Sequence, residues 1–475
     1  MRAYDNEYGY LTARPAGRRW RPWLLGLLVL GGMLILAALV AGSLRYGGPE
    51  GLLLRVQAEF AASQPQGHPM TVPTPMPTPA GGVPQALILL DPSPSAAPVP
   101  TTTPSPAQPD EAAILDQEPA GQPASLPLDL PPDAPREPVS TLVPSPTPLT
   151  DQVGPELPST VALSGLVHYW QTWNNCGPAT LAMNLSFYGS TLSQADTAAV
   201  LKPDKNDKNV SPQEMADFAR SQGYQARVLI NGNSERLKRL VAAGVPVLVE
   251  TWLEDEPDNG MGHYRLITGY DDARQQWIAY DSYVSKGVDP DKPYPGIRMS
   301  YGDLTELWRV FNRTHVVIFP ASMEPAVSAI LGEDLDETVM WQRSLAQAQA
   351  EAQKNPQDAF AWFNLGSSYV ALGDYGQAAA AFDQARVIGL PWRMLWYQFG
   401  PFHAYHETGR FRELVALADA TIATAGNIEE TFYWKGRALQ ALGDLDGARQ
   451  SYQRAVELNV NYAEAAAALA GLTPG

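Results

Sequence analysis

Cysteine is almost absent from this chain, whose 475 residues include only Cys176. A single thiol cannot form an internal disulfide, so the fold has no disulfide framework. A lone cysteine is a small buried hydrophobic residue, a palmitoylation site or a nucleophile. Its neighbours in the stretch HYWQTWNNCGPATLAMNLSFYG have to distinguish these roles.

Basic residues are also scarce. The chain carries 33 lysines and arginines against 50 aspartates and glutamates, which gives a formal net charge of −17 at pH 7. A protein that binds nucleic acid presents a basic face to the phosphates, so we expect no nucleic-acid partner. The length allows about two or three domains.

Charged residues are missing from Leu24 to Leu44, a length that suits a membrane-spanning helix of roughly 20 residues. The arginines before this run are Arg14, Arg18, Arg19 and Arg21, and only Arg45 lies close after it. The positive-inside rule therefore places residues 1–22 in the cytoplasm, a single transmembrane helix at 23–45, and the rest of the chain outside the cell membrane. The small residues of VAGS leave a cleaved signal peptide as the alternative, and either arrangement exports the rest.

Proline, serine and threonine dominate much of residues 46–160, in tracts such as PMTVPTPMPTPAGG, DPSPSAAPVPTTTPSPAQP and VPSPTPLT. Such a composition cannot bury enough apolar surface to compensate for the entropy lost on ordering. We therefore predict a disordered linker over residues 46–160, with polyproline II character. It would hold the folded part of the chain away from the membrane.

The residues after Cys176 have helical spacing. Leu181, Leu185 and Tyr188 lie four and three residues apart, and Gly189 is a typical helix stop. Cys176 is thus predicted at the amino end of a helix. Free backbone amides and the helix dipole favour an anion there, which lowers the pKa of a thiol.

A thiolate nucleophile needs a base, a group that orients the base, and donors for the developing oxyanion. Gln171 precedes Cys176 by five residues. We expect its side-chain amide to join the Cys176 backbone amide in an oxyanion hole.

The base and its orienting group are predicted on one hairpin. The stretch GHYRLITGYDDARQQWIAYDSYV begins with His263 beside Gly262 and contains two strand patterns joined by the polar turn DDARQQ. If Asp271 faces Gln275, then Arg265 faces Asp281, and the His263 and Asp281 side chains lie diagonally on one face. A slip of one residue would put them on opposite faces. Asp281 would then hold the imidazole in one orientation and tautomer.

These motifs together resemble the C39-like branch of papain-fold cysteine peptidases, whose bacterial relatives process bacteriocin leaders. The resemblance covers residues 161–321 and includes the closing stretch SYGDLTELWRVFNRTHVVIFP. It implies an α+β papain-like peptidase domain. We expect no metal or cofactor. The catalytic residues implied are Gln171, Cys176, His263 and Asp281. Leader-processing members are fused to ABC transporters, whereas this chain has no P-loop, which argues against a double-glycine leader as substrate.

Each of these four residues also has a structural interpretation: an inert thiol, a polar loop residue, a satisfied strand-end histidine and a turn carboxylate. His168 and His315 are expected to be structural. His403 and His406 are expected to face a partner helix and not to bind a metal. The stretch DKNDKN is not a calcium loop, because Lys208 stands where an acidic ligand is required.

The last third of the chain repeats. AWFNLGSSYVALGDYGQAAAAFDQA aligns with TFYWKGRALQALGDLDGARQSYQRA, and a weaker copy, YQFGPFHAYHETGRFRELVALADAT, lies between them. The pattern is that of tetratricopeptide repeats, with turn glycines at Gly373, Gly409 and Gly443. We predict an all-α repeat domain over residues 337–472. Its concave face, bearing Asn364 and Tyr405, is expected to bind a protein substrate or partner.

The sequence therefore predicts a membrane-tethered, extracytoplasmic cysteine peptidase that hydrolyses peptide amide bonds through Cys176. One alternative is another acyl-transfer activity on the same triad, such as a transpeptidase or deamidase. A second alternative, of a different class, is a non-catalytic module that only binds peptides.

Overall fold

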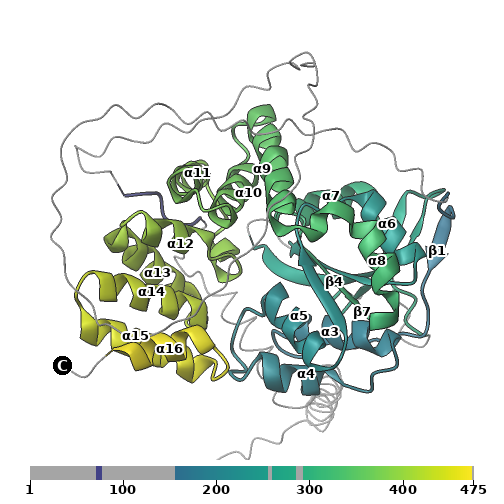
Figure 1. Ribbon diagram of the computed structural model, residues 1–475, viewed down its shortest axis with the longest axis horizontal. Coiled ribbons are helices and arrows are strands. Elements are labelled where there is room, and N and C mark those ends of the chain that lie inside the picture. Colours follow the sequence, from purple (N-terminus) through teal and green to yellow (C-terminus); the bar gives the residue numbers. More distant parts are fainter. Residues whose placement is uncertain (1–70, 77–155, 255–258, 285–292, 473–475) are drawn as a thin grey trace, which may run out of the picture. The chain divides into compact units, whose positions relative to one another are not determined.

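The computed structural model describes residues 71–76, 156–254, 259–284 and 293–472. They form a mixed α/β domain followed by a helical repeat region, which agrees with the predicted pair of folded domains (Figure 1). The predicted cytoplasmic segment, the transmembrane helix at 23–45 and most of the predicted linker lie outside the described residues. Within the described ranges, no helix is long and apolar enough to span a bilayer.

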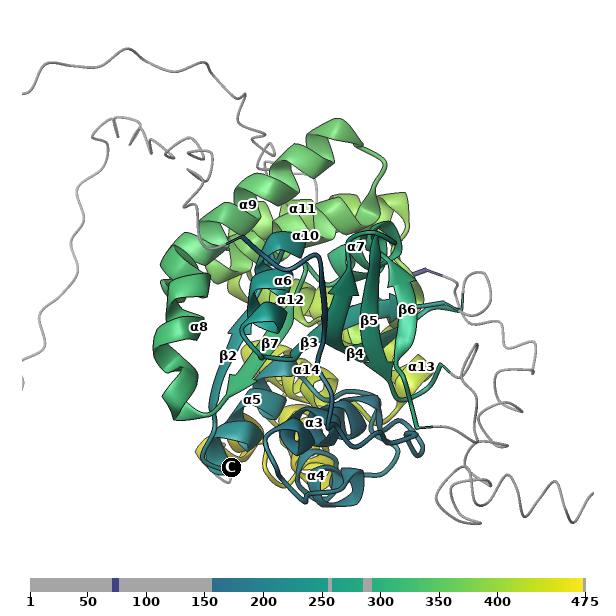
Figure 2. The same cartoon turned by 90° about the vertical axis from the view of Figure 1, so that its right-hand side faces the viewer.

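One antiparallel sheet organises the α/β domain. Its strands are β1 (Thr160–Ala162), β2 (Gln225–Leu229), β3 (Val247–Leu253), β4 (Met261–Asp271), β5 (Gln276–Asp281), β6 (Ile297–Ser300) and β7 (His315–Phe319). The order is β2-β7-β3-β4-β5-β6, visible in Figure 2, and β1 pairs with the far end of β4. β7 follows the other six strands in the sequence but lies between β2 and β3 in the sheet. The sheet is therefore complete only when the chain as far as β7 has folded.

Helices cover both faces of this sheet. They are α3 (Cys176–Phe187), α4 (Gln194–Leu201), α5 (Pro212–Ser221), α6 (Ser234–Ala242), α7 (Tyr301–Arg309) and α8 (Glu324–Leu331). Successive side chains of a strand point to opposite faces. In β7, Val316 and Ile318 pack with residues of α3 and α5, whereas Val317 and Phe319 pack with residues of α6 and α8.

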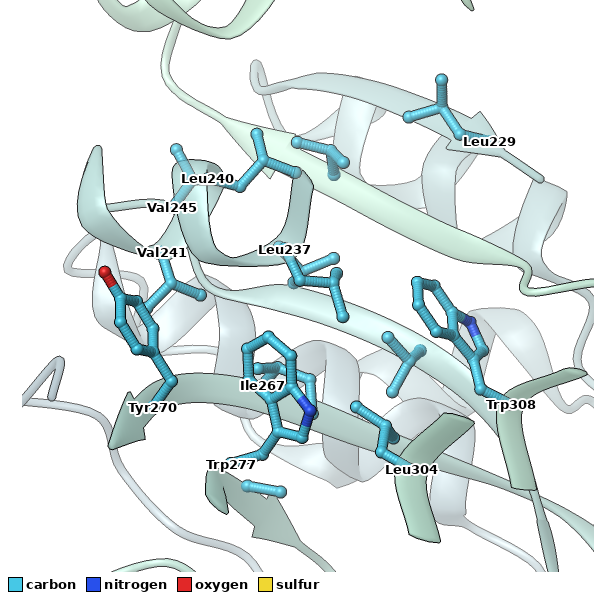
Figure 3. Packing of buried hydrophobic residues seen from close by; sticks show 14 of the residues in the cluster. Leu229, Leu237, Leu240, Val241, Val245, Ile267, Tyr270, Trp277, Leu304 and Trp308 are labelled. Atoms are coloured by element: carbon cyan, nitrogen blue, oxygen red, sulfur yellow. The ribbon is translucent and has the colours of Figure 1, made fainter. Parts of the chain in front are cut away.

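The core on the α6 face is drawn in Figure 3. Leu237, Leu240 and Val241 of α6 share one cluster with Ile267 and Trp277 of the sheet. Each of these side chains is almost fully buried. Burial of one such side chain stabilises a fold by roughly 1.5–3 kcal/mol, so this cluster fixes the hairpin of β4 and β5 firmly.

The opposite face holds α3, which is buried on every side from Gly177 to Ser186. Two polar side chains tie this apolar helix to the sheet. Thr180 Oγ1 donates to the Tyr264 carbonyl at 3.3 Å, and Asn184 Nδ2 donates to the Pro246 carbonyl at 3.1 Å. The first turn of α3 therefore lies against β4, close to His263.

The hairpin register differs from the predicted one at the turn and agrees with it at the site. Asp271 pairs with Gln276, not with Gln275, which has φ +53 and belongs to the turn. A β-bulge between Ile267 and Gly269 then shifts the register by one residue, and Arg265 faces Asp281 as predicted.

The repeat region consists of antiparallel helices. They are α9 (Glu337–Lys354), α10 (Ala359–Ala371), α11 (Tyr375–Ile388), α12 (Gly400–Glu407), α13 (Phe411–Ala425), α14 (Glu429–Ala441), α15 (Leu445–Leu458) and α16 (Ala463–Gly471). Short 3₁₀ helices occur at η1 (Ala321–Met323), η2 (Gly332–Leu335) and η3 (Trp392–Trp396). The predicted turn glycines Gly373, Gly409 and Gly443 all have φ between +73 and +84, a conformation that favours glycine.

The α/β domain and the repeats belong to one compact unit. Asn364, predicted on a free recognition surface, is 1% exposed and donates from Nδ2 to the Arg309 carbonyl of α7 at 2.7 Å. Asn364 therefore joins the repeats to the α/β domain and does not lie on an open binding surface. Tyr405 is also fully buried, and its hydroxyl lies inside a polar network of the repeats.

Candidate active site

Cys176 is the first residue of α3, as predicted from the sequence. The chain enters the helix through Asn174, which has a positive φ of +52. Lys202 supports this entry, because its buried ammonium group donates to the Asn174 carbonyl at 2.8 Å. The thiol itself is only partly buried, so it remains open to a small reagent.

His263 and Asp281 form a buried pair beside this helix end. His263 Nε2 lies 3.0 Å from Asp281 Oδ1, and the two side chains are 3% and 0% exposed. Oδ1 also accepts hydrogen bonds from the backbone amides of Tyr283 and Val284, each at 2.8 Å. Arg265 Nε lies 2.9 Å from Asp281 Oδ2. Asp281 is thus held rigidly, and it fixes the ring of His263.

The charges around His263 and Asp281 favour an ion pair between these two side chains. Burial would raise the pKa of Asp281, but His263 and Arg265 hold it well below its usual range. Burial would likewise lower the pKa of His263, yet Asp281 outweighs burial and raises it to about 9.

The pKa of the Cys176 thiol is lowered, whereas that of His263 is raised. Burial alone would raise the pKa of Cys176, but the hydrogen bond and the positive charge of His263 lower it below its ordinary value. Nε2 of the ring is used by Asp281, so Nδ1 is the nitrogen that is left for the thiol. The arrangement therefore favours a thiolate beside an imidazolium.

Gln171 lies at the same end of the hairpin. Its backbone amide donates to the Ser282 carbonyl at 2.8 Å, and its Oε1 accepts from the Ser282 hydroxyl at 2.8 Å. Since Oε1 is used as an acceptor, the side chain presents Nε2 as its donor. The backbone of Ser282, next to Asp281, thereby positions the predicted oxyanion-hole residue.

A small cavity opens at the thiol. Its walls are Asn174, Cys176, Gly177, Lys208, Asn209, Val210, Glu250, Gly262, Tyr264 and Tyr397. Neither Glu250 nor Tyr397 was predicted from the sequence as part of the site.

Glu250 lies on β3, opposite Tyr264 of β4, and is 3% exposed. Its Oε2 has no hydrogen-bond partner among the residues that the structure describes. Burial raises the pKa of this carboxyl group well above its usual value, and the neighbouring Cys176 adds to the effect. The sequence contained one signal for it: Glu250 is the only charged residue in the apolar run PVLVETWL.

Tyr397 reaches the cavity from the repeat region, directly after η3. Its ring packs on Gly262, where a Cβ atom would come within 3.1 Å of the ring carbons. Arg393 of η3 holds the neighbouring loop, since its Nη1 donates to the carbonyls of Asn259 at 2.9 Å and Gly260 at 3.2 Å. The repeats thus supply one wall of the site. No repeat pattern indicates this, because Tyr397 falls in the weakest copy.

The other histidines that the structure describes do not line the cavity. His168, expected to be structural, donates from Nε2 to the Asp281 carbonyl at 2.8 Å and stacks on Tyr294 with ring centroids 3.5 Å apart. His315 is fully buried, and burial lowers its pKa to about 3. His403 and His406 lie near the ring of Trp434. In the described ranges, no group of three or more histidine, cysteine, aspartate or glutamate side chains is placed to hold a metal ion.

Comparison with known families agrees with this geometry. Residues 165–314 match the Peptidase_C39 like family. Residues 359–388 and 429–462 match the tetratricopeptide repeat. The resemblance found in the sequence is therefore confirmed for both regions, while the middle copy at about α12 and α13 falls outside the matched segments.

Solved structures similar to this chain include one named as a C39-like peptidase from Bacillus anthracis. It is 17% identical, covers 34% of this chain and 96% of its own, and has a TM-score of 0.27. Another is a double glycine motif protease from an AMS/PCAT transporter, in complex with the leader peptide. It is 14% identical, covers 34% of this chain and 95% of its own, and has a TM-score of 0.25. Among curated proteins there is no match.

Proposed function

We propose that this chain is a cysteine peptidase that hydrolyses peptide amide bonds. The observation that carries the proposal is the buried pair of His263 and Asp281 beside a thiol at the first residue of a helix. Cys176 is the nucleophile, His263 the acid and base, and Asp281 the residue that orients His263. Gln171 and the Cys176 backbone amide donate to the oxyanion.

The chemistry follows from the protonation states. The Cys176 thiolate attacks the carbonyl carbon of the scissile amide, and the oxyanion accepts hydrogen bonds from Gln171 Nε2 and the Cys176 amide. The His263 imidazolium gives its Nδ1 proton to the leaving amine, which leaves a thioester on Cys176. Water, deprotonated by His263, then attacks the thioester and releases the carboxylic acid product.

The setting of this activity is part of the proposal. The uncharged run from Leu24 to Leu44, with arginines before it, supports a single-pass anchor at 23–45 in the cell membrane of a bacterium. The peptidase domain and the repeats would then lie on the extracytoplasmic side, and the repeats would bind a protein substrate or partner.

Alkylation of Cys176 followed by mass spectrometry tests the catalytic part. With iodoacetamide at about pH 5–6, well below the ordinary thiol pKa of about 8.5, the native chain should react rapidly. His263→Ala should slow that reaction, and the control His406→Gln, in the repeats, should leave it unchanged. Cys176→Ala should abolish peptide hydrolysis. Hydrolysis that persists in Cys176→Ala would refute the nucleophile, and slow alkylation with an ordinary thiol profile would favour the non-catalytic alternative.

A further inference from the structure

A short piece of the predicted linker, Thr71–Met76, is extended and lies against the repeats, where Figure 1 shows it in purple beside α11 and α12. The Val72 amide donates to the Leu390 carbonyl at 2.8 Å, and Thr71 forms an antiparallel bridge with Pro391. Val72 is 2% exposed, whereas its neighbours Thr71 and Pro73 are exposed. The segment is therefore anchored by one aliphatic side chain.

Arg386 of α11 holds the backbone that follows this anchor. Its Nε donates to the Pro73 carbonyl at 2.8 Å, and its Nη2 donates to the Thr74 carbonyl at 3.1 Å. At the far end, the Met76 amide donates to Glu413 Oε1 at 3.1 Å. The segment thus meets a donor for its carbonyls and an acceptor for its amide.

These recognition groups are built into the repeats. Arg386 is 3% exposed and Glu413 is 7% exposed. Arg386 Nη1 donates to Glu413 Oε1 at 2.8 Å and to the Tyr405 hydroxyl at 2.7 Å. A buried, paired arginine has little freedom to lose when it binds a second group, so it recognises a peptide backbone efficiently.

Two features of the segment suit this site. Proline restricts the free segment to extended conformations, so less entropy is lost on binding. Extended segments of this kind also leave their carbonyls unpaired, and Arg386 uses two of them. The motif Val72-Pro73-Thr74-Pro75 has a close counterpart in the same chain, Val143-Pro144-Ser145-Pro146.

We propose that Arg386, Leu390, Tyr405 and Glu413, here called the Arg386 site, form a binding site for extended segments with an aliphatic residue before Pro-Thr/Ser-Pro. Thr71–Met76 is its intramolecular ligand. A partner protein that carries the same motif has to displace this segment. Because a tethered ligand reaches an effective concentration in the millimolar range, free peptide competes only when the tethered segment is weakened.

Fluorescence anisotropy on the full-length chain tests the proposal, with a labelled peptide of residues 68–79 as the probe. The native chain should bind the probe weakly. Val72→Asp removes the buried anchor of the tethered segment and should tighten probe binding by more than about tenfold. An unlabelled peptide of residues 140–149 should compete, and the same peptide with aspartate in place of its valine should not.

Adding Arg386→Met to Val72→Asp should abolish the gain, whereas adding Arg437→Met, at an arginine of α14 that also bonds a tyrosine, should preserve it. If the Arg386→Met combination unfolds, Arg386→Lys keeps a positive charge for Glu413 but offers no planar fork to two carbonyls, and it should lose most of the gain. A folded Val72→Asp chain that binds no better than the native one overturns the proposal. Tighter probe binding that persists in both Arg386 variants would also overturn the proposal. Alkylation of Cys176 should be the same in all these chains, which separates this result from the proposed peptidase activity.

Discussion

The α/β domain and the repeats bring their functional residues together in different ways. Cys176, His263 and Asp281 are separated by up to about a hundred residues and meet only because the sheet pairs distant strands. The Arg386 site instead comes from neighbouring helices, within the stretch from α11 to α13. Substitutions in the sheet should therefore act on the chemistry, and those in the repeats should act on local stability and binding. Tyr397 is the exception, since it belongs to the repeat region but lines the cavity at Cys176.

The largest effect is expected from Asp281→Asn, which tests the sheet's contribution to the chemistry. The amide has nearly the shape of the carboxylate but lacks the charge that raises the pKa of His263 to about 9. The imidazolium then becomes less stable, and kcat/KM on a peptide substrate should fall by a factor on the order of 10²–10⁴. Alkylation of Cys176 at about pH 5–6 should slow in parallel, because the thiolate loses its cation.

Asp272→Asn is the matched control on the same hairpin, because Asp272 pairs with Lys238 and not with a histidine. It should leave both rates near those of the native chain. Equal losses in the two variants would mean that the hairpin fold, and not the charge at Asp281, sets the rate. His168→Ala would not serve as a neutral control, since His168 donates to the Asp281 carbonyl.

Much of the site geometry could be predicted from the sequence, because it depends on local patterns. Helical spacing after Cys176 put the thiol at a helix start, and the two strand patterns around the turn put His263 and Asp281 on one hairpin. The turn glycines of the repeats followed from their period. In each case the deciding residues lie close together in the sequence.

The features that could not be predicted depend on contacts between distant segments. The turn between β4 and β5 is one residue longer than expected, and the β-bulge at Thr268 restores the predicted pairing of Arg265 with Asp281. The backbone of β1 also lies close to Gly269, next to this bulge. Glu250 and Tyr397 reach the cavity through tertiary packing. The contact of Val72 with Leu390 joins residues more than three hundred positions apart, in a tract whose composition alone indicates disorder.

Gly366→Ala tests whether the repeats can be disturbed without affecting the sheet. A Cβ at this position would lie 2.7 Å from the ring of Phe382, so α10 and α11 would have to separate. Overpacking of this kind destabilises a fold by roughly 1–3 kcal/mol. Thermal unfolding followed by circular dichroism should show the loss, while alkylation of Cys176 in the native range of temperature should not change.

Gly471→Ala, where a Cβ meets open space, is the control and should unfold as the native chain does. If Gly366→Ala changes the alkylation of Cys176 as much as it changes stability, the two regions unfold together. The repeats would then depend on the α/β domain for their stability.

Buried carboxyl groups where the two regions meet predict a dependence on pH. Glu430 accepts from Asn209 at 2.8 Å, and Asn459 donates to Glu429 at 2.7 Å and to Glu214 at 3.4 Å. Burial raises the pKa of Glu429 from 4.5 to about 7. Burial also raises the pKa values of Glu214, Glu430 and Asp207.

A carboxyl group whose pKa is raised on folding stabilises the fold fully below its unfolded pKa, and this contribution is lost as the pH rises through the folded pKa. The melting temperature should therefore fall between about pH 4.5 and pH 7, by about 2–4 °C for each kcal/mol lost. Glu429→Gln should flatten this fall, because glutamine does not ionise, and the exposed Glu464→Gln should not. A melting temperature that rises over this range would contradict the assignment.

Tyr397→Ala should have the smallest effect, and it examines the one wall that the repeats give to the site. Removing the ring uncovers Gly262 and widens the approach to Cys176, but leaves His263 and Asp281 in place. Iodoacetamide is the smaller reagent and depends less on the width of the approach, so its rate of reaction should hardly change. A bulky maleimide should react faster by about three- to tenfold, which corresponds to at most ~1.4 kcal/mol. Tyr397→Phe keeps the ring and should behave as the native chain with both reagents. Equal acceleration of both reagents in Tyr397→Ala would indicate a changed thiol pKa, and no acceleration of either would show that the repeats do not limit access to the thiol.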